Sequence, residues 1–376
     1  MFDAVIIGLG GMGSAAAYHL SRRDKKVLGL ERFSVAHGLG SSHGRSRIIR
    51  QAYFEGAEYV PLVMRAYELW EELERGSGED LMEITGALMI GSPDSEIVSG
   101  SLKSAEEHDL HHEMLDAKEI KRRYPAFDPP PVAVALFEKR AGFVKPEASV
   151  KAHLDLAAEN GAELHFEEPV TSWEASENGV EVKTKSGSYR AERLIIAAGA
   201  WASEMLVGMS LPLRVERRVM HWFEPRGDTR LFSRERFPIF LWDPEGEDVF
   251  YGVPDAPGAV KAAFHYVGED CDPDTLEREV GEEEVSKIRS YLERYVPDLA
   301  GRRVESKACM YTNTPDSHFV ISQHPAHPQV SVAAGFSGHG YKFCGVVGEI
   351  LADLTTIGET RHPIGLFDLV RFGEER

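Results

Sequence analysis

The sequence has few cysteines, a shortage of positive charge and no long apolar run. Its three cysteines, Cys271, Cys309 and Cys344, are far apart and form neither a CxxC pair nor a disulfide framework, which favours a reducing, cytoplasmic setting. The 42 lysines and arginines face 61 aspartates and glutamates, so the formal net charge is -19. This acidic balance argues against nucleic acid and anionic membranes as partners, because both attract positive charge. No apolar run approaches the roughly 18 residues of a membrane-spanning helix.

The rest of the composition is that of an ordinary globular protein. Hydrophobic residues make up 43% and charged residues 27% of the 376 positions. A chain of this length suggests two or three domains. The opening stretch has no basic residues ahead of its apolar core, MFDAVIIGLGG, so we expect a first β-strand there rather than a signal peptide.

A βαβ unit opens the chain. Residues 4–7 predict a strand, a helix of small residues follows, and a second strand ends at Glu31. Between the first strand and the helix, Gly8, Gly10 and Gly13 have GxGxxG spacing, which serves a tight turn, close approach of backbone to a pyrophosphate, and helix–strand contact. Glu31 follows where an acid would hold a ribose hydroxyl. We therefore predict a dinucleotide site. A glycine turn in an unrelated α/β unit is the plain alternative, and the motif alone leaves NAD and FAD open.

Two later turns are also rich in small residues. One of them follows a predicted strand that ends at Ala198 and Gly199, in LIIAAGAW. Flavin enzymes use such a strand end to bring a late strand against the dinucleotide. A buried strand with a small-residue turn is the alternative. The second turn joins a strand to a helix and carries Lys342, in GFSGHGYKF. Its backbone N–H groups and this cation suit an anion or a flavin edge; an ordinary turn with a surface lysine is the alternative.

The predicted elements follow the order α/β, β, α/β, β, α/β along the chain. Apolar residues at steps of three and four predict a helix from residue 59 that Gly76 closes. Between Gly86 and Pro146 we expect β-structure without helix–strand alternation, and the alternation returns at Pro146. Residues 212–318 are mostly strand-like, with one helix. This order predicts two domains that are interleaved in sequence.

Cations gather in one stretch of this acidic chain, SSHGRSRIIR. His43, Arg45, Arg47 and Arg50 lie there among isoleucines. A buried carboxylate is costly unless it is paired, and the planar fork of arginine suits that pairing. The group therefore favours a buried anion, with solvated surface arginines as the alternative. The histidines of HDLHH, residues 108–112, are expected to be exposed, and no metal site is predicted.

Three stretches stand out by their length and unusual composition: SSHGRSRIIRQAYFEGAEYVPL, ACMYTNTPD and GFSGHGYKF. Together they resemble the monomeric sarcosine oxidase family, which includes N-methyltryptophan oxidase and is related to pipecolate oxidases. The match runs from residue 2 to about residue 368. It implies α/β and α+β structure, with a Rossmann-type FAD-binding domain interleaved with a mainly antiparallel β-sheet substrate domain. We place the FAD-binding domain at residues 1–85, 145–211 and 319–376, and the substrate domain at 86–144 and 212–318.

The resemblance implies roles for individual residues. Arg47 would lie beside the flavin ring, and Arg50 and Lys342 would hold the substrate carboxylate. Lys261 would stand on the flavin face where O2 reacts. Cys309 would attach the FAD covalently through its sulfur.

Further residues complete the implied site. His265 and Tyr251 would line the substrate pocket. The sequence departs from the best-known members at Arg45, where they have an acid, and at Ser46, where they have threonine; Arg45 is expected to point elsewhere. The residues expected to contact FAD are Gly8, Gly10, Gly11, Met12, Gly13, Glu31, Arg32, Ser41, Ser46, Arg47, Ile48, Val170, Ala198, Gly199, Trp201, Cys309, Met310, Gly338, His339, Gly340 and Lys342.

The implied function is an FAD-dependent oxidase of a small secondary amino acid. Sarcosine is the expected substrate, with glycine, formaldehyde and H2O2 as products. N-methyltryptophan, pipecolate or a proline-like amine are open alternatives. A flavin dehydrogenase with another electron acceptor is disfavoured by Lys261, and a flavoprotein without activity by Arg50 and Lys342. We expect a monomer whose partners are the substrate and O2, with no nucleic acid, membrane or metal.

Overall fold

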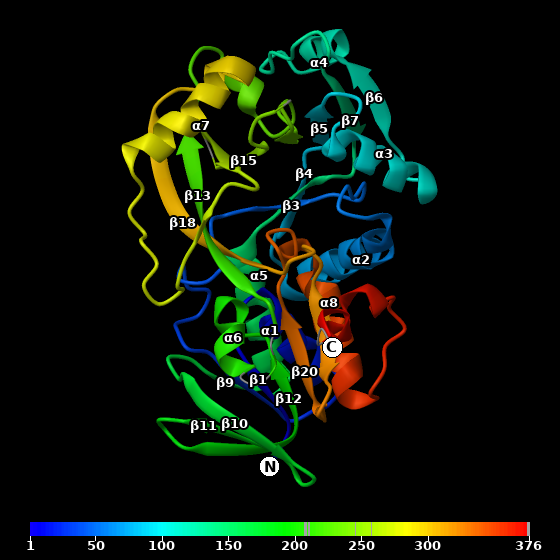
Figure 1. Cartoon of the computed structure of the whole chain (residues 1–376), viewed down its shortest axis with the longest axis vertical. Coiled ribbons are helices and arrows are strands. Elements are labelled where there is room, and N and C mark those ends of the chain that lie inside the picture. The colour runs from blue at the N-terminus through cyan, green and yellow to red at the C-terminus, as the bar shows by residue number, and fades with distance from the viewer. Residues whose placement is uncertain (207–208, 210, 245, 257, 374–376) are drawn as a thin grey trace.

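Two sheets, each with its own helices, occupy the two halves of the molecule in the computed structural model (Figure 1). The structure describes residues 1–373 apart from 207–208, 210, 245 and 257. The first sheet lies in the lower half of Figure 1, where α1, α5, β1 and β12 are labelled, and the second sheet lies above it. Both chain halves return to each sheet, so neither sheet is built from one continuous segment.

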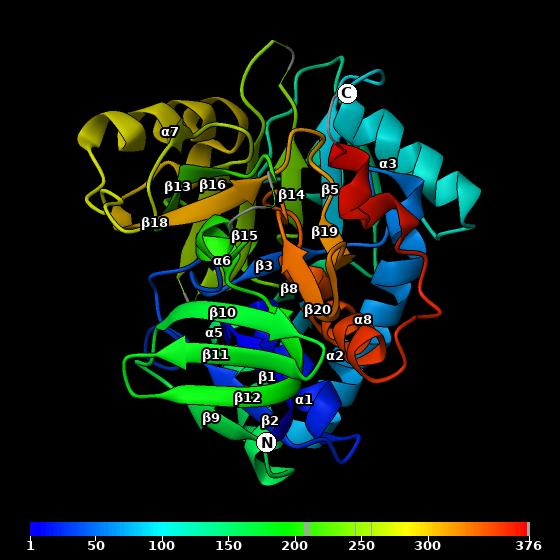
Figure 2. The same ribbon diagram turned by 60° about the horizontal axis from the view of Figure 1, so that its bottom comes forward.

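The first sheet has eight strands, and its central strands run parallel. They are β1 (Phe2–Ile7), β2 (Val27–Leu30), β9 (Glu163–His165), β10 (Val170–Ser176), β11 (Gly179–Thr184), β12 (Ser188–Ile196), β19 (Val320–His324) and β20 (His327–Ala334). The order is β10-β11-β12-β1-β2-β9, with β20 beside the last residues of β12 and β19 beside β20. Figure 2 turns β10, β11 and β12 toward the viewer.

The strands of the first sheet are apolar because both of their faces are covered. In β1, Ala4 and Ile6 pack in the same core as the helices, whereas Val5 and Ile7 belong to a separate core on the opposite face. This alternation follows from the two-residue period of a strand. A parallel sheet buried in this way needs the near-continuous apolar runs that the sequence has here.

Four helices cover the Ala4 side of the first sheet: α1 (Gly11–Ser21), α2 (Val60–Ser77), α5 (Pro146–Glu159) and α8 (Cys344–Thr356). Helices α1 and α8 approach closely, since a Cβ on Gly348 would lie 2.6 Å from the Cβ of Ala15. The short helix α6 (Ala202–Met205) follows the Gly199 turn. The predicted end of α2 at Gly76 was wrong: Gly76 lies inside the helix, and Gly78 ends it with a φ of 72°.

The second sheet has nine strands and is antiparallel except where β14 runs parallel to β5. Its strands are β5 (Ala87–Gly91), β6 (Glu113–Asp116), β7 (Val134–Glu138), β13 (Arg214–Phe223), β14 (Ile239–Trp242), β15 (Phe250–Ala256), β16 (Ala259–Phe264), β17 (Glu269–Asp270) and β18 (Arg303–Asn313). The order is β17-β13-β16-β15-β14-β5-β7-β6, and β18 pairs with β13. Helix α7 (Glu282–Tyr295) packs on it through Val285, Ile288 and Leu292.

Helix and strand do alternate between Gly86 and Pro146, contrary to the prediction. Helix α3 (Glu96–Glu107) begins at Ser95, whose side chain accepts a hydrogen bond from the Val98 N–H. Helix α4 (Ala117–Arg123) begins in the same way at Asp116. Both starts are local N-cap signals. They were overlooked because the surrounding strands are short.

A small third sheet, β3 (Arg47–Ile49), β8 (Gly142–Val144) and β4 (Met82–Ile84), lies between the two large ones. It pairs strands from both of the predicted domains. The fold class, α/β with a mainly antiparallel second sheet, is confirmed. The domain boundaries themselves stay a prediction.

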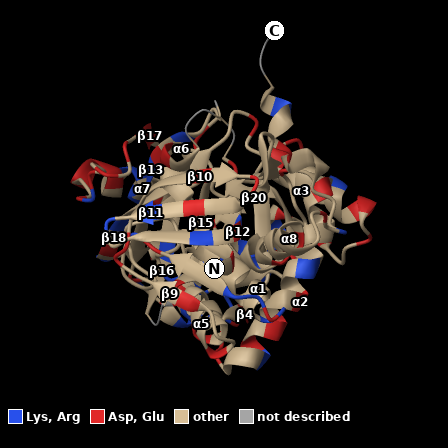
Figure 3. Ribbon diagram, turned by 90° about the horizontal axis from the view of Figure 1, so that it is seen from below, with Lys and Arg blue, Asp and Glu red and all other residues tan. Residues whose placement is uncertain are grey.

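The molecular surface matches the acidic composition. Figure 3 shows lysines and arginines scattered among aspartates and glutamates around the rim of the molecule. No helix in the described part of the chain has both the length and the apolarity needed to cross a membrane.

Candidate active site

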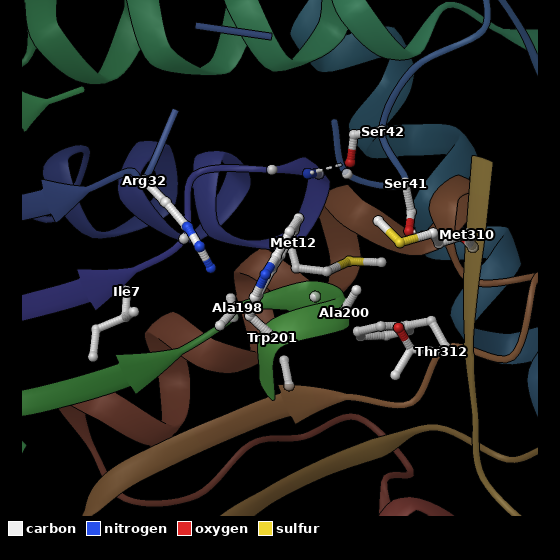
Figure 4. Close-up of a pocket in the computed structure, with 18 of the residues that line it drawn as sticks. Ile7, Met12, Arg32, Ser41, Ser42, Ala198, Ala200, Trp201, Met310 and Thr312 are labelled. Carbon is white, nitrogen blue, oxygen red and sulfur yellow. Dashed lines mark hydrogen bonds between the residues drawn. The ribbon is translucent and has the colours of Figure 1, made fainter. Parts of the chain in front are cut away.

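A cavity of about 610 Å³ opens at the carboxyl ends of the parallel strands β1, β2, β12 and β20. We call it the large cavity. Open α/β sheets bind their ligands at this edge. Figure 4 shows Ile7 and Arg32 toward one end of the large cavity, and Ser41, Ser42 and Met310 toward the other.

The glycines after β1 are required by their surroundings. Gly8 has a φ of +89°, and a Cβ there would lie 2.6 Å from the Ala197 carbonyl oxygen. A Cβ at Gly13 would lie 1.8 Å from the Gly8 carbonyl oxygen. Only glycine therefore allows this turn and the approach of α1 to the sheet. Gly10 faces the large cavity, with Ser42 Oγ as its nearest neighbour at 3.3 Å.

Two charged residues follow β2 in the wall of the large cavity. Glu31 is buried; its carboxylate accepts hydrogen bonds from the N–H groups of Leu9, at 2.8 Å, and Phe33, at 3.0 Å. Arg32 pairs with Asp274 at 2.8 Å, and its guanidinium lies 5.3 Å from the ring centre of Trp201. The cavity therefore has a fixed anion at the end of β2 and a cation beside an aromatic ring.

The predicted FAD contacts divide between this cavity and a smaller neighbour. Those that line the large cavity are Gly8, Gly10, Gly11, Met12, Glu31, Arg32, Ser41, Arg47, Val170, Ala198, Gly199, Trp201, Met310, Gly338 and Gly340. Ser46, Ile48, His339 and Lys342 line only the smaller one. Gly13 and Cys309 line neither, although Cys309 lies beside Met310 and contacts Arg47.

The smaller cavity has a volume of about 50 Å³, and we call it the small cavity. All six residues predicted to be catalytic line it: Arg47, Arg50, Tyr251, Lys261, His265 and Lys342. They come from β3 and the residue after it, β15, β16 and the residue after it, and the turn between β20 and α8, so the structure assembles them from distant segments. The two cavities adjoin, since both contact Arg47, Tyr311 and Gly338.

Arg47 lies where the two cavities meet. It donates hydrogen bonds to the carbonyl oxygens of Ser46, at 2.8 Å, and Ser41, at 2.7 Å, and its Nη2 lies 3.5 Å from Cys309 Sγ. Burial alone would raise the pKa of the Cys309 thiol, but His43 and then Arg47 lower it to about 6. This lowering favours the thiolate of Cys309, which is the nucleophilic form.

Arg50 is buried and already has an acidic partner. Its Nη2 lies 2.5 Å from Glu55 Oε2, and its guanidinium lies 4.3 Å from the ring centres of both Tyr53 and Phe54. Burial would raise the pKa of Glu55, but Arg50, together with His339 and Lys342, lowers it to about 2. The other oxygen, Oε1, is buried and has no hydrogen-bond partner among the described residues.

Lys342 approaches the small cavity from the turn after β20. Its Nζ donates to the His339 carbonyl oxygen at 2.7 Å and to Tyr53 Oη at 3.2 Å. Burial and then repulsion from Arg50 lower the pKa of Lys342 to about 7. Both members of the predicted carboxylate clamp thus face one small, dry space.

Lys261 lies on β16 of the second sheet, whereas Lys342 follows β20 of the first sheet. Its Nζ donates to the carbonyl oxygens of Gly44, at 3.2 Å, and Ser46, at 2.7 Å, and to Ser46 Oγ. Burial lowers the pKa of Lys261 to about 8, although Asp255 acts in the opposite direction.

His265 and Tyr251 form uncharged walls of the small cavity. Burial lowers the pKa of His265 to about 3, so its ring is neutral at physiological pH. Burial raises the pKa of Tyr251 well above its usual value. Arg45, by contrast, is exposed and pairs with Glu305 at 2.7 Å, so it points away from the cavity as predicted.

Two residues of the site, Glu55 and Tyr311, were not predicted from the sequence. Glu55 pairs with Arg50, and Tyr311 lines both cavities. Glu55 lies only five residues after Arg50, so its position was a usable signal. His43, predicted only as one of a group of cations, lies beside Cys309. Among the described residues, no group of three or more histidine, cysteine, aspartate or glutamate side chains is arranged to hold a metal.

The glycine-rich loop, the parallel sheet and the large cavity define a dinucleotide-binding α/β protein. The chain belongs to the family of FAD dependent oxidoreductases known as DAO, whose model matches residues 3–354. Its cofactor is therefore FAD.

Comparisons with individual proteins agree with this family. The chain is 54% identical to a monomeric sarcosine oxidase of Streptomyces avermitilis, over 98% of this chain and 97% of the relative. It is 33% identical to an N-methyl-L-tryptophan oxidase of Yersinia pestis, over 99% of each chain. Among solved structures, NikD, an unusual amino acid oxidase, has a TM-score of 0.87 at 23% identity, covering 98% of this chain and 97% of that one. L-proline dehydrogenase from P. horikoshii has a TM-score of 0.87 at 24% identity, covering 99% and 97%. These two likenesses concern the fold.

The residues present fit FAD. A Cβ at Gly338 would lie 2.1 Å from the Tyr311 ring, at the point where the two cavities meet. Gly338 and Tyr311 therefore pack tightly at the place where a flavin and its substrate would meet. Arg32 lies at the far end of the large cavity (Figure 4), and Glu31, which precedes it in the chain, lines the same cavity, as a long dinucleotide requires.

Proposed function

We propose that this protein is a sarcosine oxidase, which converts sarcosine, O2 and water to glycine, formaldehyde and H2O2. The observation that carries the proposal is the meeting of two buried cations, Arg50 and Lys342, in a cavity of about 50 Å³. A buried cation pair suits a carboxylate, because an unpaired anion is very costly there. Monomeric sarcosine oxidases among its relatives support the same substrate.

The size of the small cavity favours sarcosine over larger amines. A buried water needs about 10–15 Å³ of cavity volume measured in this way, so about 50 Å³ suits a substrate of a few heavy atoms. An indole side chain, as in N-methyltryptophan, has no room beside His265 and Tyr251 without movement of the walls. Pipecolate and proline-like amines fall between these extremes.

The side chains of the small cavity would bind the substrate and keep its nitrogen uncharged. Arg50 would either release Glu55 and pair with the substrate carboxylate, or pair with both anions at once. Lys342 would add a second positive charge. His265 and Tyr251 are neutral, so they offer the substrate nitrogen no anion that would hold it as an ammonium. FAD would supply the redox chemistry when bound: it would take a hydride, one proton with two electrons, from the N-methyl carbon, and O2 with one further proton would take these up as H2O2.

Lys261 would serve the reaction with O2 rather than amine binding. Negative charge develops on oxygen as it is reduced, and a fixed cation in a dry site lowers that barrier. Lys261→Met should leave anaerobic reduction by sarcosine nearly intact and slow reoxidation strongly. Stopped-flow traces with the opposite pattern would refute this role.

Cys309 would carry the FAD covalently through its sulfur. The low pKa of Cys309 and the contact with Arg47 support a thiolate there. After acid denaturation, the yellow colour should stay with the peptide that contains Cys309, and Cys309→Ser should release it. Cys344 is the matched control, because burial raises the pKa of its thiol to about 12. Free flavin from the unaltered enzyme would disprove the link and leave the oxidase proposal standing.

The deciding experiment is a panel of secondary amino acids with detection of H2O2. We expect sarcosine to have the highest kcat/KM and N-methyltryptophan to be poor. Activity with an artificial electron acceptor but not with O2 would instead indicate a dehydrogenase. A sedimentation measurement of the loaded enzyme tests the proposed monomer.

A further inference from the structure

Behind Lys261 lies a second buried carboxylate that has no part in the function proposed above. Asp255, at the end of β15, has a fully buried side chain, and its Oδ2 lies 3.6 Å from Lys261 Nζ. Ser46 joins the two, since its hydroxyl donates to Asp255 Oδ2 at 2.6 Å and accepts from Lys261 Nζ. The other oxygen, Oδ1, accepts from Trp222 Nε1 at 2.8 Å.

Asp255 lies near the end of β15, and its side chain is buried. The sequence around it, PDAPG, is typical of an exposed turn. In the structure, however, Val253 of β15 lies opposite Lys261 of β16. Asp255, two residues further along β15, reaches the same interior space as Lys261.

The arrangement leaves Lys261 dependent on Asp255 for its charge. All three N–H groups of a lysine ammonium have acceptors here, two of them backbone carbonyls and one Ser46 Oγ. A neutral amine has only two N–H groups and needs a donor for its lone pair. Because Ser46 gives its only proton to Asp255, it offers none to Lys261. The geometry therefore matches the charged form of Lys261.

Other charges face Lys261 from neighbouring elements. Arg47 of β3 disfavours its charge, and Glu147 of α5 supports it from further away. Arg45 and Lys307 lie over the Trp222 ring, at 5.0 and 5.9 Å from its centre, and both pair with Glu305. Asp255, unlike Glu147, is also joined to Lys261 through the Ser46 hydroxyl.

We propose that Asp255 is a positioning residue that keeps Lys261 charged and oriented through the Ser46 hydroxyl, so that a fixed cation is present where O2 reacts. The inference rests on the proposed function for its purpose, but the link between Asp255 and Lys261 can be tested without any substrate. Asparagine is nearly isosteric with aspartate and keeps one oxygen for Trp222 Nε1, while its NH2 group would donate to Ser46 Oγ. Asp255→Asn therefore removes the charge and frees the Ser46 proton for the lone pair of a neutral Lys261 amine.

The first test follows the charge on Lys261 in the resting holoenzyme. A cation close to the flavin affects its absorption spectrum, so we expect a spectral change with a midpoint near pH 8 in the unaltered protein. Asp255→Asn should move this midpoint down by about 1 to 3 pH units, because an adjacent opposite charge has that effect on a pKa. Lys261→Met should abolish the spectral change in either background. A midpoint that stays in place in Asp255→Asn would overturn the proposal.

The second test uses thermal unfolding and does not depend on the spectrum. In Lys261→Met, Asp255 becomes a buried anion without its counter-ion, which is strongly destabilising. Asp255→Asn should therefore raise the Tm in the Lys261→Met background and lower it in the unaltered protein. Equal changes in both backgrounds would mean that the two residues act independently, and the proposal would be wrong. Ser46→Ala, which removes only the bridge, should give a smaller downward shift of the spectral midpoint.

The outcomes separate this inference from the proposed function. If no secondary amino acid yields H2O2, the proposed function fails, yet the spectral and thermal tests still decide the link. If sarcosine is oxidised, reoxidation of reduced Asp255→Asn should be slower than in the unaltered enzyme at pH values between the two spectral midpoints, and should match it well below both, where Lys261 is charged in both proteins. Identical pH profiles would contradict the role of Asp255 while leaving the oxidase intact.

Discussion

The positive charge of Arg50 is shared before any substrate arrives. Glu55 lies 2.5 Å from its guanidinium, and both side chains are buried. A substrate carboxylate must therefore displace this acid or join it. Lys342, which has no carboxylate partner within ion-pair distance among the described residues, is free to meet the incoming anion.

Substituting Arg50 should weaken carboxylate binding. A charged hydrogen bond is worth roughly 1.5–3 kcal/mol, so Arg50→Ala should weaken an acetate-type inhibitor by about ten- to over a hundred-fold. Titration of the flavin absorbance with the inhibitor measures the affinity. Glu55→Gln should instead strengthen inhibitor binding, because it removes the competing anion.

Arg45 supplies the matched control for Arg50. It lies five positions away in the same stretch, but it is exposed and pairs with Glu305. Exposed ion pairs contribute little to stability, and Arg45 does not line the small cavity. Arg45→Ala should therefore change the inhibitor affinity far less than Arg50→Ala. Equal losses in the two variants would remove Arg50 from the clamp.

The turn between β20 and α8 packs tightly against strand β18. Gly338 has a φ of +78°, and a Cβ there would overlap the ring of Tyr311 on β18. The same turn supplies His339 and Lys342 to the small cavity. The spacing between the first and second sheets at this point is therefore set by a glycine.

Gly338→Ala should disturb FAD binding more than it disturbs the rest of the fold. The left-handed backbone costs alanine roughly 1–2 kcal/mol, and Tyr311 must also move. We expect a lower Tm and a clear loss of FAD per polypeptide, measured by absorbance after gel filtration. Gly365→Ala is the control, because no atom lies within 4 Å of its Cβ position. Full FAD content in Gly338→Ala would show that the turn tolerates a side chain.

Five of the buried histidines in the described part of the chain make the whole molecule sensitive to acid. Burial lowers the pKa of His19, His221 and His339 to about 4, and that of His153 and His265 to about 3. The ordinary value is 6.5. Between these values the unfolded chain binds protons that the folded chain does not. The free energy of unfolding therefore falls as the pH drops from about 6.5 toward 4.

The Tm should fall more steeply once the pH drops below about 6.5, where the histidines of the unfolded chain begin to bind protons. Each histidine contributes about 1.4 kcal/mol per pH unit in the window between its two pKa values. His153→Leu should make the fall less steep, since the Nδ1 of His153 is buried without a hydrogen-bond partner in the described part of the chain. Differential scanning fluorimetry from pH 8 to 4.5 measures both slopes. A Tm that does not change across this range would contradict the prediction that these histidines are neutral in the folded protein.

The sequence by itself determined the features that depend on short stretches of chain. The glycines of the first loop, the strand that ends at Glu31 and the turn that carries Lys342 all behave as predicted, because turn geometry and strand–helix contact need particular residues at fixed spacing. The resemblance of three motifs then indicated that Arg47, Arg50, Lys261 and Lys342 belong to one site. The roles given to them stay predictions.

Only the tertiary structure decided which charges meet. Asp255 occupies a turn-like sequence, yet the packed structure buries its side chain beside Lys261. Cys309 acquires a low pKa because its strand runs next to His43 and Arg47, more than 260 positions away along the chain. Burial, strand register and the dielectric around a charge depend on the whole packed molecule, whereas spacing along the chain records only local geometry.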